Sequence, residues 1–463
     1  METNHKETDH KGTRGSFSGK LGFVLSAAGA SVGLGNIWRF PYLAAKHGGG
    51  MFLLVYLILA ITFGYTMIVA ETCIGRITKK SPVGAFRYFH SGRFGKVGGW
   101  INSLIPLLII PYYSVIGGWV LKYLAGYAMG QTKEMANEAF FGSFMTNGTQ
   151  TELFFIIFII CTMVIIYLGV RNGIERVSRF MMPVLVILAL IIMVYSVTRP
   201  GALTGVKYLF IPNLKRFSWM TVVAAMGQMF YSLSIAMGIL ITFGSYMKDD
   251  VSIDEATRNV EIFDTGIAVM AGLMIIPAIF AFSNGDPAIL SSGPSLMFVT
   301  LPKVFASMGF GRIIGLVFFL LVFFAALTSS IALAESVVST LSDEFGWSRH
   351  KSTLVAAVII ILLGTLSALG YGPLAGVTVI GMQFLDFFDF LTNSVMMPIA
   401  AVMICLLVVR YMGIGKIEEE MCKNGHSFGR KGIFNVMIRY ICPIFLLIIL
   451  ASSIASVFGW IKI

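Results

Sequence analysis

Two stretches, Gly29-Ala-Ser-Val-Gly-Leu-Gly35 and Ser232-Leu-Ser-Ile-Ala-Met-Gly238, interrupt apolar segments that otherwise have the character of membrane-spanning helices. A bilayer offers no water to backbone N–H and C=O groups, so a helix unwinds there only where protein, ion or solute binds the freed groups. Paired interruptions at corresponding places in two halves of a chain indicate a binding site near the membrane midplane. The two stretches therefore predict a secondary transporter.

The composition is that of an integral membrane protein. Of the 463 residues, 57% are hydrophobic and 12% are charged, and the mean hydropathy is +0.83. Many stretches reach the roughly 20 apolar residues that cross a bilayer. The net charge of +11 falls in short loops rather than in a basic stripe with interleaved aromatic residues, so a membrane lipid environment is expected and a nucleic-acid partner is not.

Hydropathy predicts an all-α polytopic membrane protein with eleven spans. They cover residues 18–44, 50–76, 98–126, 151–169, 174–197, 218–246, 260–283, 310–341, 353–370, 384–410 and 436–460. Basic loops after the second, fourth and tenth spans place the N-terminal tail, residues 1–17, in the cytoplasm, and an odd number of spans then leaves the C-terminus outside. The long segment 284–309 is expected to fold back as an outer lid.

The spacing of the two breaks predicts one transporter domain, residues 1–463, that contains an inverted repeat. The first five-helix half covers residues 18–197 and the second covers 218–410, with unwound helices 1 and 6 and an extra span at 436–460. Such repeats place the solute and the coupling ion where the halves meet.

The residues in the first break suit a cation and an anion at once. Unwound backbone from Gly29 to Gly35 offers carbonyl oxygens and N–H groups, and Asn36 adds a neutral oxygen ligand. The half-helix that begins there has its positive dipole end at the break, which favours a carboxylate. Glycines also let membrane helices pack closely, so the pattern alone leaves that alternative open.

Hydroxyl groups lie in two further spans. Ser232 and Ser234 belong to the second break, while Ala325, Thr328 and Ser329 share one face of the span 310–341. Hard cations prefer such oxygen ligands. Serine and threonine hydroxyls in membrane helices also bond back to their own helix, and this second interpretation stays open.

Charged residues inside spans are costly and mark functional sites or caps. We expect Glu71 to cap broken backbone and Asp264 to face Ser232. Arg39 and Asp389 can pair above the site, although interfacial snorkelling and a helix cap are alternatives for them.

Together these motifs resemble the neurotransmitter:sodium symporter family, in particular its eleven-span bacterial amino-acid branch. The resemblance runs over nearly the whole chain, through Ala27-Ala-Gly-Ala-Ser-Val-Gly-Leu-Gly-Asn-Ile-Trp-Arg-Phe-Pro41, His47-Gly-Gly-Gly50, Glu71, Pro111-Tyr-Tyr113, Gly227-Gln228, Phe230-Tyr-Ser-Leu-Ser234 and Phe324-Ala-Ala-Leu-Thr-Ser-Ser330.

The resemblance implies two sodium sites. The carbonyls of Gly29, Val32 and Ala325 with the hydroxyls of Thr328 and Ser329 would form one of them. The other would use the Ser31 carbonyl, Asn36, Ser232, Asp264 and the carboxylate of the substrate.

The resemblance also implies a substrate pocket and two gates. The substrate would meet Ser31, Gly33, Leu34 and Gly35 of the first break, Tyr231, Ser232 and Ser234 of the second, Tyr113 through its hydroxyl, and the side chains of Ile109, Ile116, Met237, Ser329 and Leu333. Tyr113 and Tyr231 would form the outer lid beneath Arg39 and Asp389. Arg14 with Asp343 would close the inner gate, helped by Ser245 and Tyr246, and the helix through Gly173 to Pro183 would unwind to release inner sodium.

Three departures from other branches of the family refine the expected function. Relatives that carry amines place an aspartate where this chain has Gly33, so a substrate that brings its own carboxylate is favoured. Asp264 supplies a fixed negative charge near Tyr56, Gln228 and Ser232, so chloride is not expected. Ala236 stands where relatives often have glycine, which can restrict unwinding or pocket volume.

The sequence therefore predicts a sodium-coupled symporter in the plasma (inner) membrane that takes up a neutral, hydrophobic or aromatic L-amino acid by alternating access. The alternatives are a proton-coupled amino-acid transporter and a non-concentrating channel of the same fold. An enzyme is not expected, because the six histidines lie mostly in tails and loops and form no catalytic pattern. The sequence does not indicate an oligomeric state.

Overall fold

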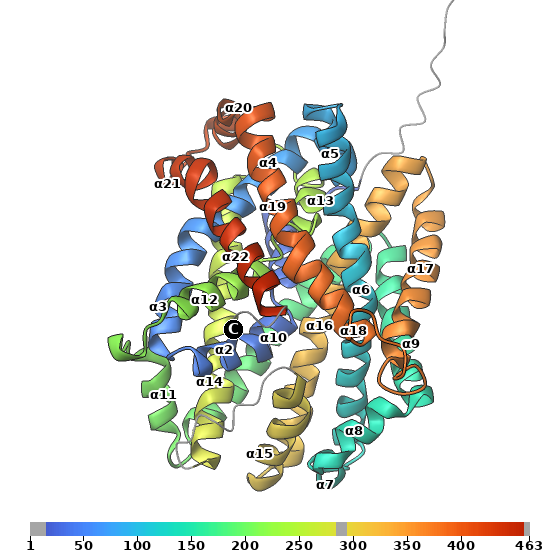
Figure 1. Cartoon of the computed structure of the whole chain (residues 1–463), viewed down its shortest axis with the longest axis vertical. Coiled ribbons are helices and arrows are strands. Elements are labelled where there is room, and N and C mark those ends of the chain that lie inside the picture. Colours follow the sequence, from blue (N-terminus) through green and yellow to red (C-terminus); the bar gives the residue numbers. More distant parts are fainter. Residues whose placement is uncertain (1–14, 284–293, 458–463) are drawn as a thin grey trace, which may run out of the picture.

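The protein is almost entirely helical in a computed structural model, which describes residues 15–283 and 294–457. Figure 1 shows long helices that run between two ends of the molecule. One end carries α5 (Pro82–Phe89) and α20 (Ile414–Met421), and the opposite end carries α7 (Thr132–Met135), α8 (Glu138–Thr146) and α15 (Leu301–Ser307). The predicted all-α fold is confirmed.

Nine helices in the described residues are long and apolar enough to cross a bilayer. They are Gly50–Thr78 (α3 to α4), Arg93–Ala128 (α6), Gly148–Tyr167 (α9), Val170–Val197 (η3 and α10), Ile253–Phe282 (α14), Gly311–Phe345 (α16), Arg349–Leu369 (α17), Phe384–Met412 (α18 to η8) and Lys431–Ala455 (α21 to α22). The third predicted span begins earlier than expected, at Arg93, and the ninth begins at Arg349, because polar and basic residues continue both helices beyond their apolar parts.

Several of these spans contain a π-helical turn, a feature that is frequent at functional sites. The turns are η2 (Ala60–Gly64), η3 (Val170–Glu175), η7 (Phe390–Met396), η8 (Leu407–Met412) and η10 (Met437–Ile441). η2 joins α3 (Gly50–Leu59) to α4 (Tyr65–Thr78), and η3 precedes α10 (Arg176–Val197). η7 joins α18 (Phe384–Asp389) to α19 (Met397–Leu406), and η8 follows α19. η10 joins α21 (Lys431–Val436) to α22 (Cys442–Val457). The expected unwinding between Gly173 and Pro183 is not seen in this structure, because η3 leads directly into a continuous α10 that contains Pro183.

The first predicted break is present and forms a bent span. α1 (Lys20–Ser31) ends where Val32 takes an extended conformation, with φ −74° and ψ 93°. The chain resumes as η1 (Gly35–Arg39) and α2 (Phe40–Lys46), at 54° to α1.

The second predicted break separates α12 (Trp219–Ser232) from α13 (Ile239–Ser245). Ser234, Ala236 and Gly238 lie in the left-handed region, with φ of 54°, 58° and 68°. Ala236 therefore does not prevent the unwinding, although a residue with a side chain is strained in this conformation. The N–H of Ala236 donates to Glu71 Oε1 of α4 at 2.7 Å, which confirms Glu71 as a cap on broken backbone.

Close packing ties the inner half-helix α13 to α4. A Cβ atom on Gly75 would lie 2.0 Å from the carbonyl oxygen of Ile241, and one on Gly244 would lie 2.5 Å from that of Thr72. Small residues of this kind allow membrane helices to approach each other closely. α1 in turn packs against α10, α14 and α16, so both broken helices lie in the centre of the bundle.

The part of the predicted lid 284–309 that the structure describes is helical. η6 (Leu296–Thr300) and α15 form it, and residues 284–293 lie outside the described residues. α11 (Ala202–Phe210) follows α10 and precedes α12 along the chain, and it lies at the same end of the molecule as α15 (Figure 1).

Candidate substrate and ion site

A cavity with about 360 Å³ of empty space lies between the two breaks. Its lining comes from α1 and the first break, from α6, from α12, the second break and the start of α13, and from α16. The lining residues are Ala30, Ser31, Gly33, Leu34, Gly35, Asn36, Ile109, Tyr113, Tyr231, Ser232, Ser234, Met237, Ile239, Ser329 and Leu333. None of these residues carries a formal charge. The two unwound segments therefore meet at one uncharged chamber.

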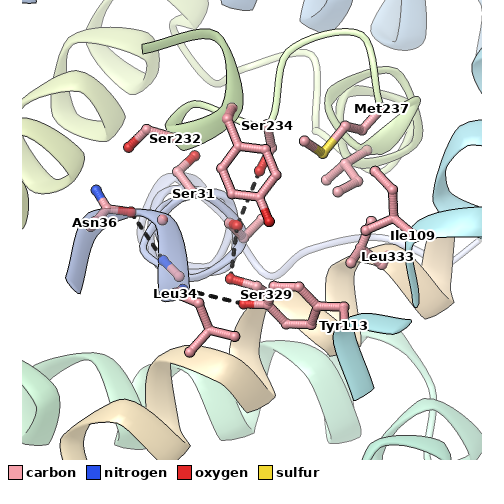
Figure 2. A pocket seen from close by; sticks show the side chains of 15 residues that line it. Ser31, Leu34, Asn36, Ile109, Tyr113, Ser232, Ser234, Met237, Ser329 and Leu333 are labelled. Atoms are coloured by element: carbon pink, nitrogen blue, oxygen red, sulfur yellow. Dashed lines mark hydrogen bonds between the residues drawn. The ribbon is translucent and has the colours of Figure 1, made fainter. Parts of the chain in front are cut away.

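The chamber has a polar side and an apolar side. Figure 2 shows Ser31, Asn36 and Ser232 on one side and Ile109, Met237 and Leu333 on the other, with Ser329 and Tyr113 between them. An arrangement of a few polar groups opposite an apolar wall fixes the orientation of a small ligand.

Side chains hold the unwound backbone of the first break in place. The N–H of Leu34 donates to the hydroxyl oxygen of Tyr113 at 3.3 Å, and the N–H of Gly33 donates to Asn36 Oδ1 at 3.2 Å. A Cβ atom on Gly33 would lie 2.7 Å from Ser329 Oγ and 3.0 Å from the Tyr113 hydroxyl. The structure therefore leaves no room for an acidic side chain at this position.

Ser329 of α16 reaches across to the carbonyl oxygens of the first break. Its hydroxyl lies 3.3 Å from Gly29 O, 3.0 Å from Ala30 O and 3.4 Å from Val32 O. Thr328 instead donates back to its own helix, to Phe324 O at 2.9 Å and Ala325 O at 3.1 Å. The alternative that a hydroxyl bonds back to its own helix therefore holds for the Thr328 hydroxyl but not for the Ser329 hydroxyl. The hydroxyl oxygens and these carbonyls form an oxygen-rich cluster of the kind that hard cations prefer.

Asp264 of α14 lies at the centre of a second polar cluster. Its carboxylate accepts from Asn36 Nδ2 at 2.8 Å, from Ser232 Oγ at 2.9 Å and from the Tyr56 hydroxyl at 3.0 Å. All four side chains are buried. This cluster joins the two breaks, because Asn36 follows the first break and Ser232 begins the second. The predicted approach of Asp264 to Ser232 is confirmed.

The apolar residues of the chamber differ from the prediction at three places, because Ala30 and Ile239 line it and Ile116 does not. Ile116 is buried but does not line the chamber. Tyr113, which lies one turn before it on α6, faces the cavity and ends it there. Ile239, which the sequence prediction missed, lines the chamber because the left-handed turn at Gly238 brings the first residue of α13 to its wall.

Arg39 and Asp389, which were expected to pair above the chamber, each contact other residues instead. The guanidinium of Arg39 lies 5.3 Å from the centre of the Tyr231 ring. Asp389 accepts from Asn393 Nδ2 at 2.6 Å and from the Tyr112 hydroxyl at 3.2 Å. Among the described residues, no ion pair joins Arg39 to Asp389. Tyr231 packs directly over Gly35, where a Cβ atom would lie 2.7 Å from its ring.

The described residues expected at the inner gate all make contacts in this structure, although their role as a gate stays a prediction. The hydroxyl of Tyr246 donates to Glu335 Oε1 at 2.7 Å, and its carbonyl accepts from the N–H of Phe17 at 3.1 Å. Arg349 pairs with Glu335 at 2.6 Å, which the sequence prediction missed. Asp343 accepts from the N–H of Ser81 at 2.7 Å, and Ser245 donates to Thr242 O at 2.5 Å. Arg14 lies outside the described residues, so its predicted pairing with Asp343 stays a prediction.

The fold and the chamber define a membrane transporter of the broken-helix type. The chain belongs to the sodium:neurotransmitter symporter family, whose sequence model matches residues 14–132 and 134–459. This membership confirms the family that the motifs predicted.

Relatives extend along most of the chain. YhdH of Bacillus subtilis, an uncharacterized sodium-dependent transporter, is 32% identical over 443 residues, which are 95% of this chain and 97% of that protein. An uncharacterized sodium-dependent transporter of Haemophilus influenzae is 31% identical over 98% of this chain and 100% of its own length. The human sodium- and chloride-dependent GABA transporter 2 is 28% identical over 90% of this chain and 74% of its own length.

A solved structure agrees closely with the fold. The crystal structure of MhsT in complex with L-phenylalanine has a TM-score of 0.85 and 37% sequence identity, and the match covers 95% of this chain and 100% of that one. The protein is therefore a sodium-dependent symporter of this family and an integral multi-pass membrane protein, rather than an enzyme.

Proposed function

We propose that the protein takes up a neutral, hydrophobic or aromatic L-amino acid together with sodium by alternating access. The observation that carries this proposal is the uncharged chamber between the two breaks. A buried charge without a partner is costly, so such a chamber favours a ligand whose own charges balance. A zwitterion meets this requirement, and MhsT was solved with one bound, L-phenylalanine.

The two sides of the chamber suit the two parts of an amino acid. The unwound backbone from Ser31 to Gly35, with Tyr113, would bind the carboxylate and ammonium groups, while Ile109, Met237, Ile239 and Leu333 would contact the side chain. A lone amine would lack a carboxylate partner, because Gly33 has no side chain and no room for one.

Two sodium ions are proposed as co-transported cargo. The cluster of Gly29, Val32, Ala325, Thr328 and Ser329 would bind one ion between α1 and α16. Ser31, Asn36, Ser232 and Asp264 would bind the other, with the carboxylate of the substrate as a further ligand. Because ion and amino acid then share ligands, each raises the affinity for the other.

Chloride independence is proposed from the position of Asp264. Its carboxylate accepts the hydroxyls of Tyr56 and Ser232, which would otherwise be donors to an anion. The protein therefore carries its own negative charge at this point, unlike relatives whose names include chloride.

The membrane orientation follows from the basic loops. The end with α5 and α20 carries Arg76, Lys79, Lys80 and Arg87, which favours the cytoplasm. In the plasma (inner) membrane the N-terminus would then be inside and the C-terminus outside. Inward movement of each net positive charge gains about 2.3 kcal/mol per 100 mV of membrane potential.

Competition in proteoliposomes tests the proposal. Uptake of labelled L-phenylalanine would be measured with an inward sodium gradient, and each of the twenty amino acids would be added in excess. We expect hydrophobic and aromatic amino acids to compete and uptake to stop when potassium replaces sodium. Competition by amines without a carboxylate, or concentrative uptake without sodium, would contradict it.

A further inference from the structure

A second cavity lies away from the substrate chamber, at the outer edge of α11. It is lined by Thr204, Lys207, Tyr208, Ile211, Asn213, Arg216 and Phe280. Two of these side chains are cationic and none is acidic. Within the described residues, neither the Lys207 ammonium nor the Arg216 guanidinium forms a hydrogen bond or an ion pair. Among residues 15–283 and 294–457, the cavity is therefore a concentration of positive charge without an acidic partner.

The contacts that the described residues make with Arg216 leave its hydrogen-bond donors available. Its guanidinium lies 4.7 Å from the centre of the Tyr208 ring, and the Tyr208 hydroxyl donates to Ala45 O at 2.6 Å, which fixes the ring. A stacked guanidinium keeps its planar set of donors, which matches the oxygens of a phosphate. Asn213 accepts from the N–H of Lys215 through Oδ1, and no described residue accepts from its amide nitrogen.

Large apolar side chains surround this basic cavity. Leu214 is 81% exposed and Trp219 is 80% exposed, and Phe210, Ile211 and Phe217 are exposed as well. Figure 1 places the connection between α11 and α12 at the edge of the molecule, beside α3. α3 carries the exposed apolar residues Leu54 and Ile58. Tryptophan is enriched at the boundary between lipid and water, and lysine and arginine extend from that boundary toward headgroups.

We propose that Lys207 and Arg216 bind the phosphate of an acidic phospholipid headgroup, with the acyl chains lying against Leu214 and Trp219. The cations and the free amide donor recognise the phosphate, and the surrounding apolar side chains explain why a lipid is favoured over a free ion. The site reaches the substrate pathway through the first broken helix, because Tyr208 bonds to Ala45 of α2 and Arg216 packs against Gly48.

Lipid-dependent thermal stability of the purified full-length protein tests this proposal. The melting temperature in detergent would be measured with phosphatidylglycerol, with phosphatidylcholine, and with soluble glycerophosphate. We expect phosphatidylglycerol to raise the melting temperature of the wild type most. Each of Lys207→Gln and Arg216→Gln should weaken phosphatidylglycerol binding about fivefold.

The matched control is Lys133→Gln, which removes another exposed lysine from the same end of the molecule and should leave the lipid response unchanged. Retained lipid counted by native mass spectrometry gives an independent measure of binding. Equal responses to both lipids would overturn the proposal, as would an unchanged response in Arg216→Gln. A full response to glycerophosphate alone would assign the site to a free anion instead.

Discussion

Asp264 joins residues from both breaks through one carboxylate. It accepts hydrogen bonds from Asn36, Ser232 and Tyr56, all of them buried. A buried charge is tolerated in a protein interior only when it is paired or hydrogen-bonded in this way. The residue therefore links the two breaks, and its position beside the chamber suits the fixed charge that we propose.

Asp264→Asn should make transport depend on chloride. The substitution removes the negative charge that the Tyr56 and Ser232 hydroxyls face, and an external anion would restore it. We expect uptake by the variant to fall about tenfold when gluconate replaces chloride, the size of a lost hydrogen bond to a charged group. Wild-type uptake should be equal in both salts. An active Asp264→Asn variant whose uptake is also equal in chloride and in gluconate would refute the fixed-charge role.

Ser329→Ala should weaken the sodium dependence of transport. The variant loses the hydroxyl that bridges α16 to the carbonyls of Gly29, Ala30 and Val32. We expect the sodium concentration for half-maximal uptake to rise about tenfold, as for the loss of a polar contact to an ion.

Ser330→Ala is the matched control for this prediction. Ser330 directly follows Ser329 in α16, but its hydroxyl bonds to the Thr162 hydroxyl at 3.0 Å on another face of the helix. The sodium concentration at which the Ser330→Ala variant reaches half-maximal uptake should stay near that of the wild type. A similar loss in both variants would show that the effect is general damage to α16.

At the scale of single elements, the second break depends on a contact that lies far away in the sequence. Two of its three left-handed residues, Ser234 and Ala236, have side chains and are strained there. Glu71 compensates by accepting the N–H of Ala236. The shape of this break is thus determined jointly by α4 and by the segment itself.

Glu71→Ala should destabilise the protein, whereas Glu71→Gln should be tolerated better. Alanine leaves the buried N–H of Ala236 without an acceptor, which costs about 1–3 kcal/mol, and glutamine keeps an acceptor oxygen. The melting temperature of each purified variant measures the difference. If both substitutions lowered it equally, the charge of Glu71 and not its bond to Ala236 would be the important feature.

The elements show which parts of the fold can be read from the sequence. Glycine clusters and hydropathy were enough for both breaks and for the spans, since these depend on local residue properties. Ile239 and Ile116 could not be placed correctly, because the wall of the chamber depends on the turn at Gly238 and on the ring of Tyr113. The Arg39 contact with Tyr231 likewise depends on side-chain positions that spacing does not fix.

At the scale of the whole molecule, the loop between the last two spans is bound to α4 and to the segment that follows α13. Arg76 of α4 is 1% exposed and pairs with Glu420, while it donates to Glu420 O at 2.6 Å and Val251 O at 2.5 Å. Lys423 pairs with Asp249 at 2.9 Å. The segment 247–252 therefore connects this loop to Tyr246, whose hydroxyl donates to Glu335.

Arg76→Ala should destabilise the protein strongly. It leaves Glu420 without its partner and removes two bonds to backbone carbonyls, and breaking a buried pair costs about 3–5 kcal/mol. Arg87→Ala is the control, because Arg87 is more exposed and pairs with Glu344 at the surface, where a pair contributes at most about 1 kcal/mol. Urea or thermal unfolding would measure both, and a similar small effect of the two would contradict the role of Arg76.

The hydroxyl of Ser329 has one more consequence. By directing its proton toward the Gly29 and Val32 carbonyls, which the proposed ion would use, it competes with that ion for them. Part of the free energy of ion binding is then offset by the loss of the hydrogen bond that the Ser329 hydroxyl already makes. This competition offsets part of the affinity that the hydroxyl adds as a ligand, so the bound ion would be released more readily at the end of each transport cycle.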